Sequence, residues 1–310
     1  MSLQLIPPDI NVDFVGKRHF FVALSTAINL AAIFLLIFVG LNYGVDFAGG
    51  SIVQLRFGQQ TDGNHIRQAL SGLHLGEITV QDFGKAGHEY LVRFEKVKNV
   101  GNLGKTLEAK LERSYPPHDV EVLRVQTVGA KVGSDLRVDA IEALVVATLF
   151  MGIYIAIQFR RVSLSFGAGA VIALVHDVLV VTGALVISRL QFDLTTLAAL
   201  LTVIGYSVHD TIIVSDRIRE DAAKRRREDL ATTMNRAINE TLSRTLLTSG
   251  TAITVLIALL VLGGPILRPP AFTLLVGFIT GTYSSIYIAG PVVLFWEGKG
   301  KRRKALSRAA

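Results

Sequence analysis

The stretch Gly205–Arg217, GYSVHDTIIVSDR, places His209 and Asp210 inside a segment that is otherwise apolar enough to be a membrane helix. A charged side chain near the middle of a bilayer costs at least about 2.5–3.5 kcal/mol on insertion scales. The pair therefore predicts either a specific partner within the protein or a function that needs a titratable group at membrane depth. The rest of the sequence decides whether this segment lies in a membrane.

The composition of the chain is that of a membrane protein. Its 310 residues are 50% hydrophobic and 18% charged, and the mean hydropathy is +0.46, whereas a soluble domain of this length is normally more polar. The sequence predicts an α-helical membrane protein with about six transmembrane helices of roughly 17–25 residues each. The first apolar run is interpreted as an uncleaved signal anchor, because no small-x-small cleavage site follows it. The apolar runs are residues 20–40, 138–158, 166–187, 194–215, 245–262 and 272–295.

The basic residues of the chain, which has a net charge of +7, cluster at alternate connections between these runs. Cytoplasmic loops carry an excess of Lys and Arg, so both termini are expected in the cytoplasm. The same rule accounts for KRRRE at residues 224–228 and favours contact with membrane lipid over nucleic acid. The loop 216–244 is predicted to form an amphipathic helix along the cytoplasmic face. The expected divisions are a cytoplasmic N-terminus (1–19), a first helix (20–40), a periplasmic domain (41–137), a five-helix bundle (138–295) and a basic cytoplasmic tail (296–310).

The polar segment 41–137 has the pattern of a small folded domain. Segments with alternating apolar residues, such as SIVQLRF and EYLVRF, are typical of strands, and two segments have helical periodicity. The order β-α-β-β-α-β predicts a ferredoxin-like α+β domain. The domain carries no Gly-rich phosphate loop and no His/Cys cluster with metal-ligand spacing, which favours packing and partner contact as its use.

Two buried ionisable pairs are the candidates for chemistry, namely His176–Asp177 in the third apolar run and His209–Asp210 in the fourth. Asp210 lies about six residues, or 9 Å, from the expected cytoplasmic end of its helix, and Arg244 begins the next run on that side. An arginine at a helix end extends along several ångströms, so an Asp210–Arg244 pair is expected. Hydroxyl groups that hold water and relay protons surround this position: Tyr206, Ser207, Thr211, Thr248, Ser249 and Thr251.

The role of the Asp210–Arg244 pair has two interpretations at this level, a proton relay and a static salt bridge. The hydroxyl groups nearby favour the relay. Adjacent residues on a helix diverge by about 100°, so His209 is expected to point away from Asp210, and one His–Asp dipeptide cannot supply two convergent metal ligands. The chain has no cysteine, and the apolar runs lack the Ser–Lys or Gly-x-Ser-x-Gly arrangement of a hydrolase. We therefore expect neither an enzyme nor a metal or other cofactor. Gly277 and Gly281 have the spacing of a close helix–helix contact.

Four stretches together resemble the SecF subunits of the SecDF protein-export complex. They are GVDFAGGS at residues 44–51, HDV at 176–178, IGYSVHDTIIVSDRIRE at 204–220 and TLSRTLLTSGTA at 241–252. The resemblance implies a six-helix half of the RND superfamily in the bacterial inner membrane, partnered by SecD and associated with the SecYEG channel, YajC, YidC and the translocating preprotein.

The resemblance also implies roles for individual residues. The proton-carrying aspartate of the family falls on Asp210 and its membrane arginine on Arg244, and the pathway is expected to include His209, Asp177, His176, Tyr206 and Thr248. Many relatives have Asn where this chain has His209. Gly44, Asp46, Gly49 and Gly50 are expected to form a structural turn, in which the glycines allow a sharp exit from the bilayer.

The resemblance thus implies an accessory subunit that couples the proton gradient to protein export. Two other functions remain open at this level. One is half of a small-molecule exporter of the RND type, and the other is a scaffold of the translocon that moves no protons.

Overall fold

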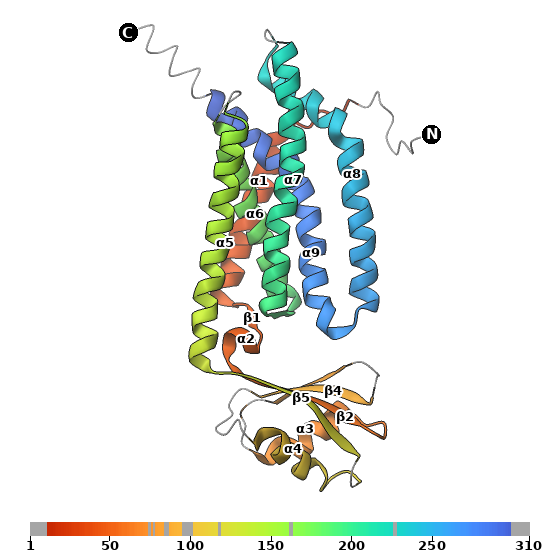
Figure 1. Cartoon of the computed structure of the whole chain (residues 1–310). Coiled ribbons are helices and arrows are strands. Elements are labelled where there is room, and N and C mark those ends of the chain that lie inside the picture. The colour runs from red at the N-terminus through yellow and green to blue at the C-terminus, as the bar shows by residue number, and fades with distance from the viewer. Residues whose placement is uncertain are drawn as a thin grey trace.

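The computed structural model describes residues 11–73, 76, 78–83, 87–94, 102–116, 119–160, 164–225 and 228–298. They form a bundle of long helices with a small sheet domain at one end (Figure 1). In the described part of the chain, six helices are long and apolar enough to cross a membrane, which confirms the predicted number of transmembrane helices. They are α1 (Arg18–Phe38), α5 (Ala130–Gln158), α6 (Ser165–Ser188), α7 (Leu194–Lys224), α8 (Leu230–Leu262) and α9 (Gly264–Ser284), which continues through a π-helical turn, η3 (Ser285–Ala289).

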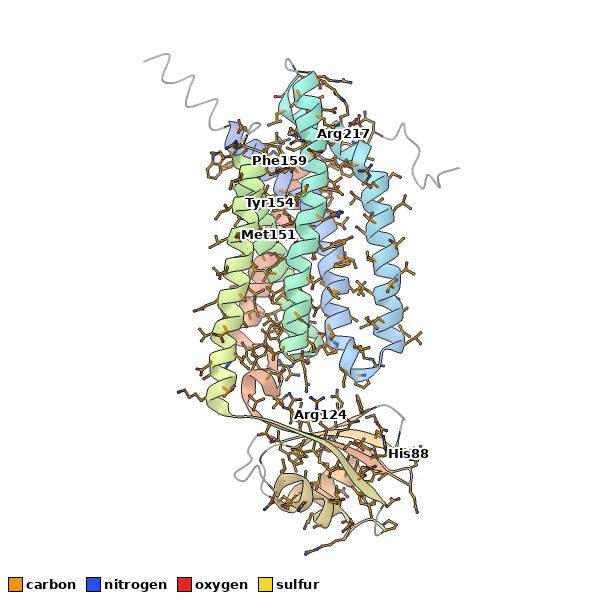
Figure 2. All side chains as sticks on the ribbon, viewed as in Figure 1. His88, Arg124, Met151, Tyr154, Phe159 and Arg217 are labelled. Carbon is orange, nitrogen blue, oxygen red and sulfur yellow. The ribbon has the colours of Figure 1, made fainter. Side chains whose placement is uncertain are left out.

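We call the end of the bundle beside the sheet domain the domain end, and the opposite end the distal end. Helix α1 begins at the distal end, and the last described helical residues return to it (Figure 1). Arg217 lies at the distal end, whereas Arg124 lies on the side of the sheet that faces the bundle (Figure 2). Both ends of the membrane-spanning part are therefore polar, and the long apolar stretch lies between them.

Helices α6, α7 and α9 form the centre of the bundle. More than half of the apolar windows of α6 and α7 is buried inside the protein, compared with 11% for α1. A Cβ atom added at Gly277 of α9 would lie 2.1 Å from the side chain of Val203 on α7, and one at Gly281 would lie 3.2 Å from Ser207. These glycines allow the two helices to approach closely, as their spacing predicts.

The domain between α1 and α5 has four antiparallel strands in the order β3-β4-β2-β5. With its two helices this is the ferredoxin-like arrangement, which confirms the predicted fold. The helices cover one face of the sheet, where Leu103, Leu107 and Leu111 of α4 are buried against β2 and β4. Burial of each such side chain stabilises the domain by about 1.5–3 kcal/mol. The elements are β2 (Gly50–Phe57), α3 (Gly63–Leu70), η1 (Ser71–Leu73), β3 (Ile78–Asp82), β4 (Glu89–Phe94), α4 (Leu103–Leu111) and β5 (Val120–Val128).

Three short elements join this domain to the bundle. Strand β1 (Asn42–Tyr43) pairs in parallel with β6 (Gln191–Phe192), which lies just before α7. A single helical turn, α2 (Val45–Ala48), follows β1 and leads into β2. The domain end of α7 and the entrance to the sheet are therefore connected through hydrogen-bonded backbone.

The segment 216–244 differs from its predicted form. Helix α7 continues to Lys224 and α8 begins at Leu230, so the charged residues lie on the ends of two long helices and not on a separate surface helix. No Gly or Pro interrupts residues 216–224, and Asp229 restarts the helix by accepting a hydrogen bond from the backbone N–H of Ala231. The amphipathic pattern reflects the packing of Met234 and Ile238 against the bundle.

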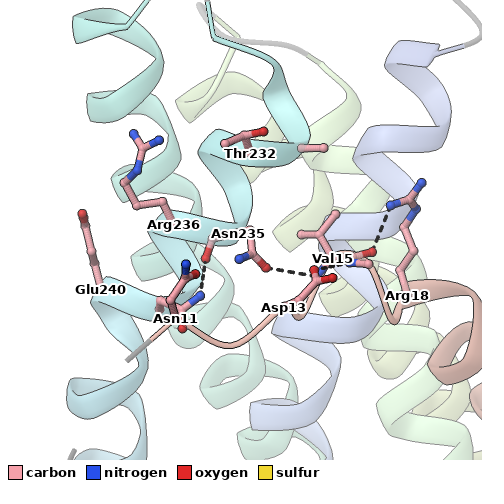
Figure 3. A pocket seen from close by; sticks show the side chains of 11 residues that line it. Asn11, Asp13, Val15, Arg18, Thr232, Asn235, Arg236 and Glu240 are labelled. Atoms are coloured by element: carbon pink, nitrogen blue, oxygen red, sulfur yellow. Dashed lines mark hydrogen bonds between the residues drawn. The ribbon is translucent and has the colours of Figure 1, made fainter. Parts of the chain in front are cut away.

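Residues 11–17, ahead of α1, lie against the first turns of α8 at the distal end (Figure 3). The Asn239 side chain accepts a hydrogen bond from the Val12 N–H (2.8 Å) and donates one to its carbonyl oxygen (2.9 Å). One turn earlier, Asn235 Oδ1 accepts from the Phe14 N–H (2.9 Å). We call residues 11–17 the N-terminal strap. A cavity of about 570 Å³ lies between the strap and α8.

Two ion pairs join α8 to neighbouring segments at the distal end. Arg217 of α7 contacts Glu240 of α8, and Arg236 of α8 contacts Glu228 in the connection before it. The hydrogen bond from Arg236 holds the pKa of the Glu228 carboxyl below its usual 4.5. In the ferredoxin-like domain, burial together with the nearby Asp82 raises the pKa of Tyr90 to about 12. Each shift has a local cause and marks an ordinary structural contact.

Candidate functional site

The two candidate carboxylates lie in the centre of the bundle. Asp210 of α7 is 0% exposed and Asp177 of α6 is 1% exposed. Within the described residues, neither forms an ion pair with a lysine or an arginine; the basic side chain closest to each is the adjacent histidine. An isolated buried carboxylate is costly when ionised, so the hydrogen bonds around each determine what it can do.

In the described structure, one carboxylate oxygen of Asp210 is hydrogen-bonded and the other is not. Thr282 of α9 donates to its Oδ2 from 3.3 Å. Its Oδ1 is buried and accepts no hydrogen bond in the described structure. The Thr282 hydroxyl lies 2.8 Å from that of Ser249 on α8, and Tyr206 donates to Ser249 from 3.0 Å. Asp210 therefore stands at one end of a chain of hydroxyl groups that crosses α9, α8 and α7.

The position of His209 corrects one expectation. Its Nδ1 lies 3.7 Å from Asp210 Oδ1, although 61% of the His209 side chain is exposed. The backbone directions diverge as expected, but the imidazole turns back toward the neighbouring carboxylate. His209 is thus the described group that links the buried Asp210 to the outer surface of the bundle.

Asp177 has both oxygens bonded. Ser207 of α7 and Ser284 of α9 donate to its Oδ2 from 2.5 Å and 2.7 Å. His176 Nδ1 lies 3.0 Å from Oδ1. Three contacts of 2.5–3.0 Å, one each from α6, α7 and α9, hold this carboxylate in place.

His176 connects this group to α1. Its ring stacks on Tyr283 with centroids 5.9 Å apart, and the Tyr283 hydroxyl lies 2.7 Å from that of Ser25 in α1. The Nε2 of His176 is buried without a hydrogen-bond partner in the described structure. The two carboxylate groups are linked through shared helices: Ser207 lies three residues before Asp210 on α7.

Arg244 does not pair with Asp210. It lies on the exposed side of α8 and lines a polar cavity of about 350 Å³ with Asp216, Glu220 and Glu240. No ion pair joins Arg244 to any residue in the part of the chain that the structure describes. The distal acidic groups attract the guanidinium outward, where water and carboxylates solvate it better than a lone buried acid.

Thr248 is also outside the hydrogen-bonded chain. It is exposed, and its hydroxyl donates to backbone carbonyls of its own helix, those of Arg244 (3.1 Å) and Thr245 (3.0 Å). The structure thus brings together Asp210, His209 and Tyr206 in one group and Asp177 with His176 in another. Arg244 and Thr248 line the outer face of α8.

Sequence reasoning missed the contribution of α9. Thr282, Tyr283 and Ser284 contact both carboxylate groups. The signal was present as TGTYSS at residues 280–285, a run of hydroxyl side chains in an apolar span. It leads directly into the π-helical turn η3, a feature that often occurs at functional positions.

The predicted structural turn has the expected backbone. Gly49 and Gly50 have φ values of +76° and +122°, a region in which other residues are strained. The Gly44 N–H donates to the Phe192 carbonyl oxygen from 2.8 Å. Asp46 accepts from the backbone N–H of Leu194 at 3.2 Å, so this turn contacts the first residue of α7. Among the described residues, no group of three or more His, Asp or Glu is placed to hold a metal ion.

These features define a class: a multi-pass membrane protein with six long apolar helices, buried carboxylates in the bundle and a ferredoxin-like domain after its first span. Two family models match the chain. Residues 106–299 match "Protein export membrane protein SecD/SecF, C-terminal" and residues 34–61 match "SecD/SecF GG Motif". The chain belongs to the SecD/SecF family of protein-export membrane proteins, which confirms the resemblance and gives it a role in Sec protein translocation.

Individual relatives agree with this assignment. "Protein translocase subunit SecF" of Calditerrivibrio nitroreducens is 42% identical over 97% of this chain and 99% of the relative. The protein of the same name from Magnetococcus marinus is 41% identical over 99% of each. The crystal structure of SecDF from Thermus thermophilus, described as a translocon-associated membrane protein, matches with a TM-score of 0.80 and 33% identity. That match covers 95% of this chain but 40% of the SecDF chain.

Proposed function

We propose that this chain is a non-enzymatic subunit that couples the proton gradient to export of preproteins through the SecYEG channel, acting with SecD in the bacterial inner membrane. The observation that carries the proposal is Asp210, which is fully buried, lacks a lysine or arginine partner in the described structure, and has one oxygen without a hydrogen bond. A carboxylate in this condition is more favourable neutral than charged unless a partner or water reaches it. It can therefore take up and release a proton when its surroundings change.

The route for that proton is supported by the hydroxyl groups next to Asp210. Thr282, Ser249 and Tyr206 form successive contacts of 3.3, 2.8 and 3.0 Å. Hydroxyl groups both donate and accept, so such a chain passes a proton by rotation of its members. The exposed His209 offers a titratable group between Asp210 and the outer face.

The partner is proposed from the outer faces of α7 and α8. His209, Arg244 and Thr248 are polar and exposed at positions where a helix facing lipid would be apolar. The match to 40% of a SecDF chain leaves room for a second half of similar kind. We propose that SecD covers this face and completes the site around Asp210, with Arg244 as a counter-charge that reaches the site in the complete complex.

The orientation follows from the same proposal. With the distal end in the cytoplasm, its arginines and lysines obey the positive-inside rule, and the ferredoxin-like domain lies in the periplasm. There the domain is on the side where preproteins emerge.

The test is Asp210→Asn in inner-membrane vesicles that contain SecD and SecYEG. Asparagine keeps the shape and one acceptor but cannot exchange a proton. We expect assembly with SecD to stay intact, while Asp210-dependent proton flux and the gradient-dependent part of preprotein export are lost. Asp216→Asn is the matched control on the same helix, since Asp216 is a partly exposed surface ion-pair partner of Arg219. Wild-type flux and export in Asp210→Asn would favour the proton-independent scaffold.

A further inference from the structure

The segment 42–50, which we call the junction, contacts both the helix bundle and the ferredoxin-like domain. On one side it contacts the bundle: β1 pairs with β6, and Asp46 Oδ2 accepts from the N–H of Leu194, the first residue of α7. Helix α7 is also the helix that carries Asp210. The proton site and the junction are thus at two points of one continuous helix, about 24 Å apart along its axis.

On its other side the junction contacts the sheet. Gln126 of β5 donates to Asp46 Oδ1 from 3.4 Å. Arg93 of β4 donates to the Tyr43 carbonyl oxygen from 2.8 Å. Asp46 therefore accepts one hydrogen bond from the bundle with Oδ2 and one from the sheet with Oδ1. Among the described residues of the junction, no other side chain has a hydrogen bond to both parts.

The junction is packed tightly enough to move as one piece. Phe47 stacks on Phe192 with ring centroids 5.4 Å apart. A Cβ atom added at Gly49 would lie 2.9 Å from the Cα of Ala130, where α5 begins. Close packing of this kind transmits displacement and does not absorb it.

We propose that the junction transmits displacement of α7 to the ferredoxin-like domain, and that Asp46 is the positioning residue that closes this link. The inference rests on the proposed function, because protonation of Asp210 is what displaces α7. Helix α7 is continuous from Leu194 to Lys224 and has no proline, so a shift at Asp210 reaches Leu194. The β1–β6 pair and Asp46 then carry the movement into β5 and the rest of the sheet.

The first experiment compares Asp46→Ala with Asp46→Asn in vesicles that contain SecD and SecYEG. Alanine loses both contacts, whereas asparagine keeps an acceptor oxygen. For Asp46→Ala we expect normal Asp210-dependent proton flux but a fall in gradient-dependent export of at least about fivefold, the lower range of coupling between distant sites. Asp46→Asn should retain a larger part of export.

The outcomes separate this inference from the proposed function. Wild-type export in Asp46→Ala overturns the inference. Loss of proton flux in Asp46→Ala also overturns it, because Asp46 would then act on the proton site. If Asp210→Asn retains flux and export, the proposed function itself fails, whatever Asp46 does.

The second experiment uses the absence of cysteine in the chain. Asn42 and Gln191 are register partners in the β1–β6 pair, so N42C/Q191C forms a bond across the junction in a complex whose other cysteines are replaced. We expect this bond to leave export unchanged in the otherwise wild-type protein and to restore export in Asp46→Ala. S51C/T127C is the matched control within the sheet, where the two native hydroxyls are 2.7 Å apart, and it should restore nothing. Loss of export on forming N42C/Q191C would overturn the inference, because the junction would then have to open and could not carry the movement as one piece.

Discussion

Asp177 and Asp210 are both buried carboxylates on neighbouring helices, but their surroundings differ. Asp177 receives two serine hydroxyls and a histidine at 2.5–3.0 Å. Asp210 receives one threonine at 3.3 Å and keeps one oxygen unbonded in the described structure. A carboxylate with both oxygens hydrogen-bonded stabilises the arrangement of the helices around it. A carboxylate with one unbonded oxygen can change its partner or its charge. The comparison is consistent with the proposal that Asp210 exchanges protons, and we propose Asp177 as an anchor of the bundle.

Of the substitutions that test this difference, Asp177→Ala should have the largest effect, which is a loss of stability. The variant leaves Ser207, Ser284 and His176 without their shared acceptor, and each unsatisfied buried donor costs about 1–3 kcal/mol. We expect a marked loss of folded protein and a lower midpoint of thermal unfolding in detergent. Asp210→Ala, which frees one weakly held hydroxyl, should change the midpoint much less. Equal falls in the unfolding midpoint of the two variants would contradict the proposed difference between Asp177 and Asp210.

Substitutions of the two hydroxyl donors on α9, Ser284 and Thr282, should have effects of intermediate size, one on stability and the other on export. Ser284→Ala removes a hydrogen bond to Asp177 and should lower the free energy of unfolding by about 0.5–1.5 kcal/mol, the range for a typical hydrogen bond. Thr282→Val keeps the volume but removes the hydroxyl beside Asp210. It should reduce gradient-dependent export while leaving the unfolding midpoint near wild type. Paired stability and transport assays on both variants check this, and a stability loss in Thr282→Val with normal export would reverse the assignment.

The smallest effect concerns Glu228, a partly buried carboxylate that forms an ion pair with Arg236. Its folded pKa is lowered from 4.5, so the pair stabilises the fold fully above about pH 4.5 and loses this contribution as pH falls through the lower folded value. Glu228→Gln should therefore lower the unfolding midpoint slightly at pH 7 and not at all well below pH 4. High salt should also reduce the difference. A difference that persists in acid would show that the contact is not electrostatic.

Much of the fold was predictable because it depends on local patterns. The spans follow from uninterrupted apolar runs, and the ferredoxin-like order follows from alternation and helical period. The segment 216–244 was misjudged because its apolar residues, such as Met234, indicate a buried face equally well for a surface helix and for an extended transmembrane helix.

The site was less predictable because it depends on contacts between distant segments. Asp210 was identified from its cost in a membrane, but its partner Thr282 is 72 residues away. The position of Arg244 follows from the acidic groups that gather at the distal end only after folding. The turn of His209 toward Asp210 is a side-chain torsion, on which helical spacing has no influence.

The N-terminal strap has a consequence for the order in which the protein is built. Val12 and its partner Asn239 are 227 residues apart, so four transmembrane helices and the ferredoxin-like domain are synthesised before Asn239 is available to the strap. The first described residues of the chain are therefore among the last to be fixed in place, once α8 has entered the membrane. A bulky fusion ahead of the strap would consequently disturb the fifth helix at the final stage of assembly, and leave the first helix correctly inserted.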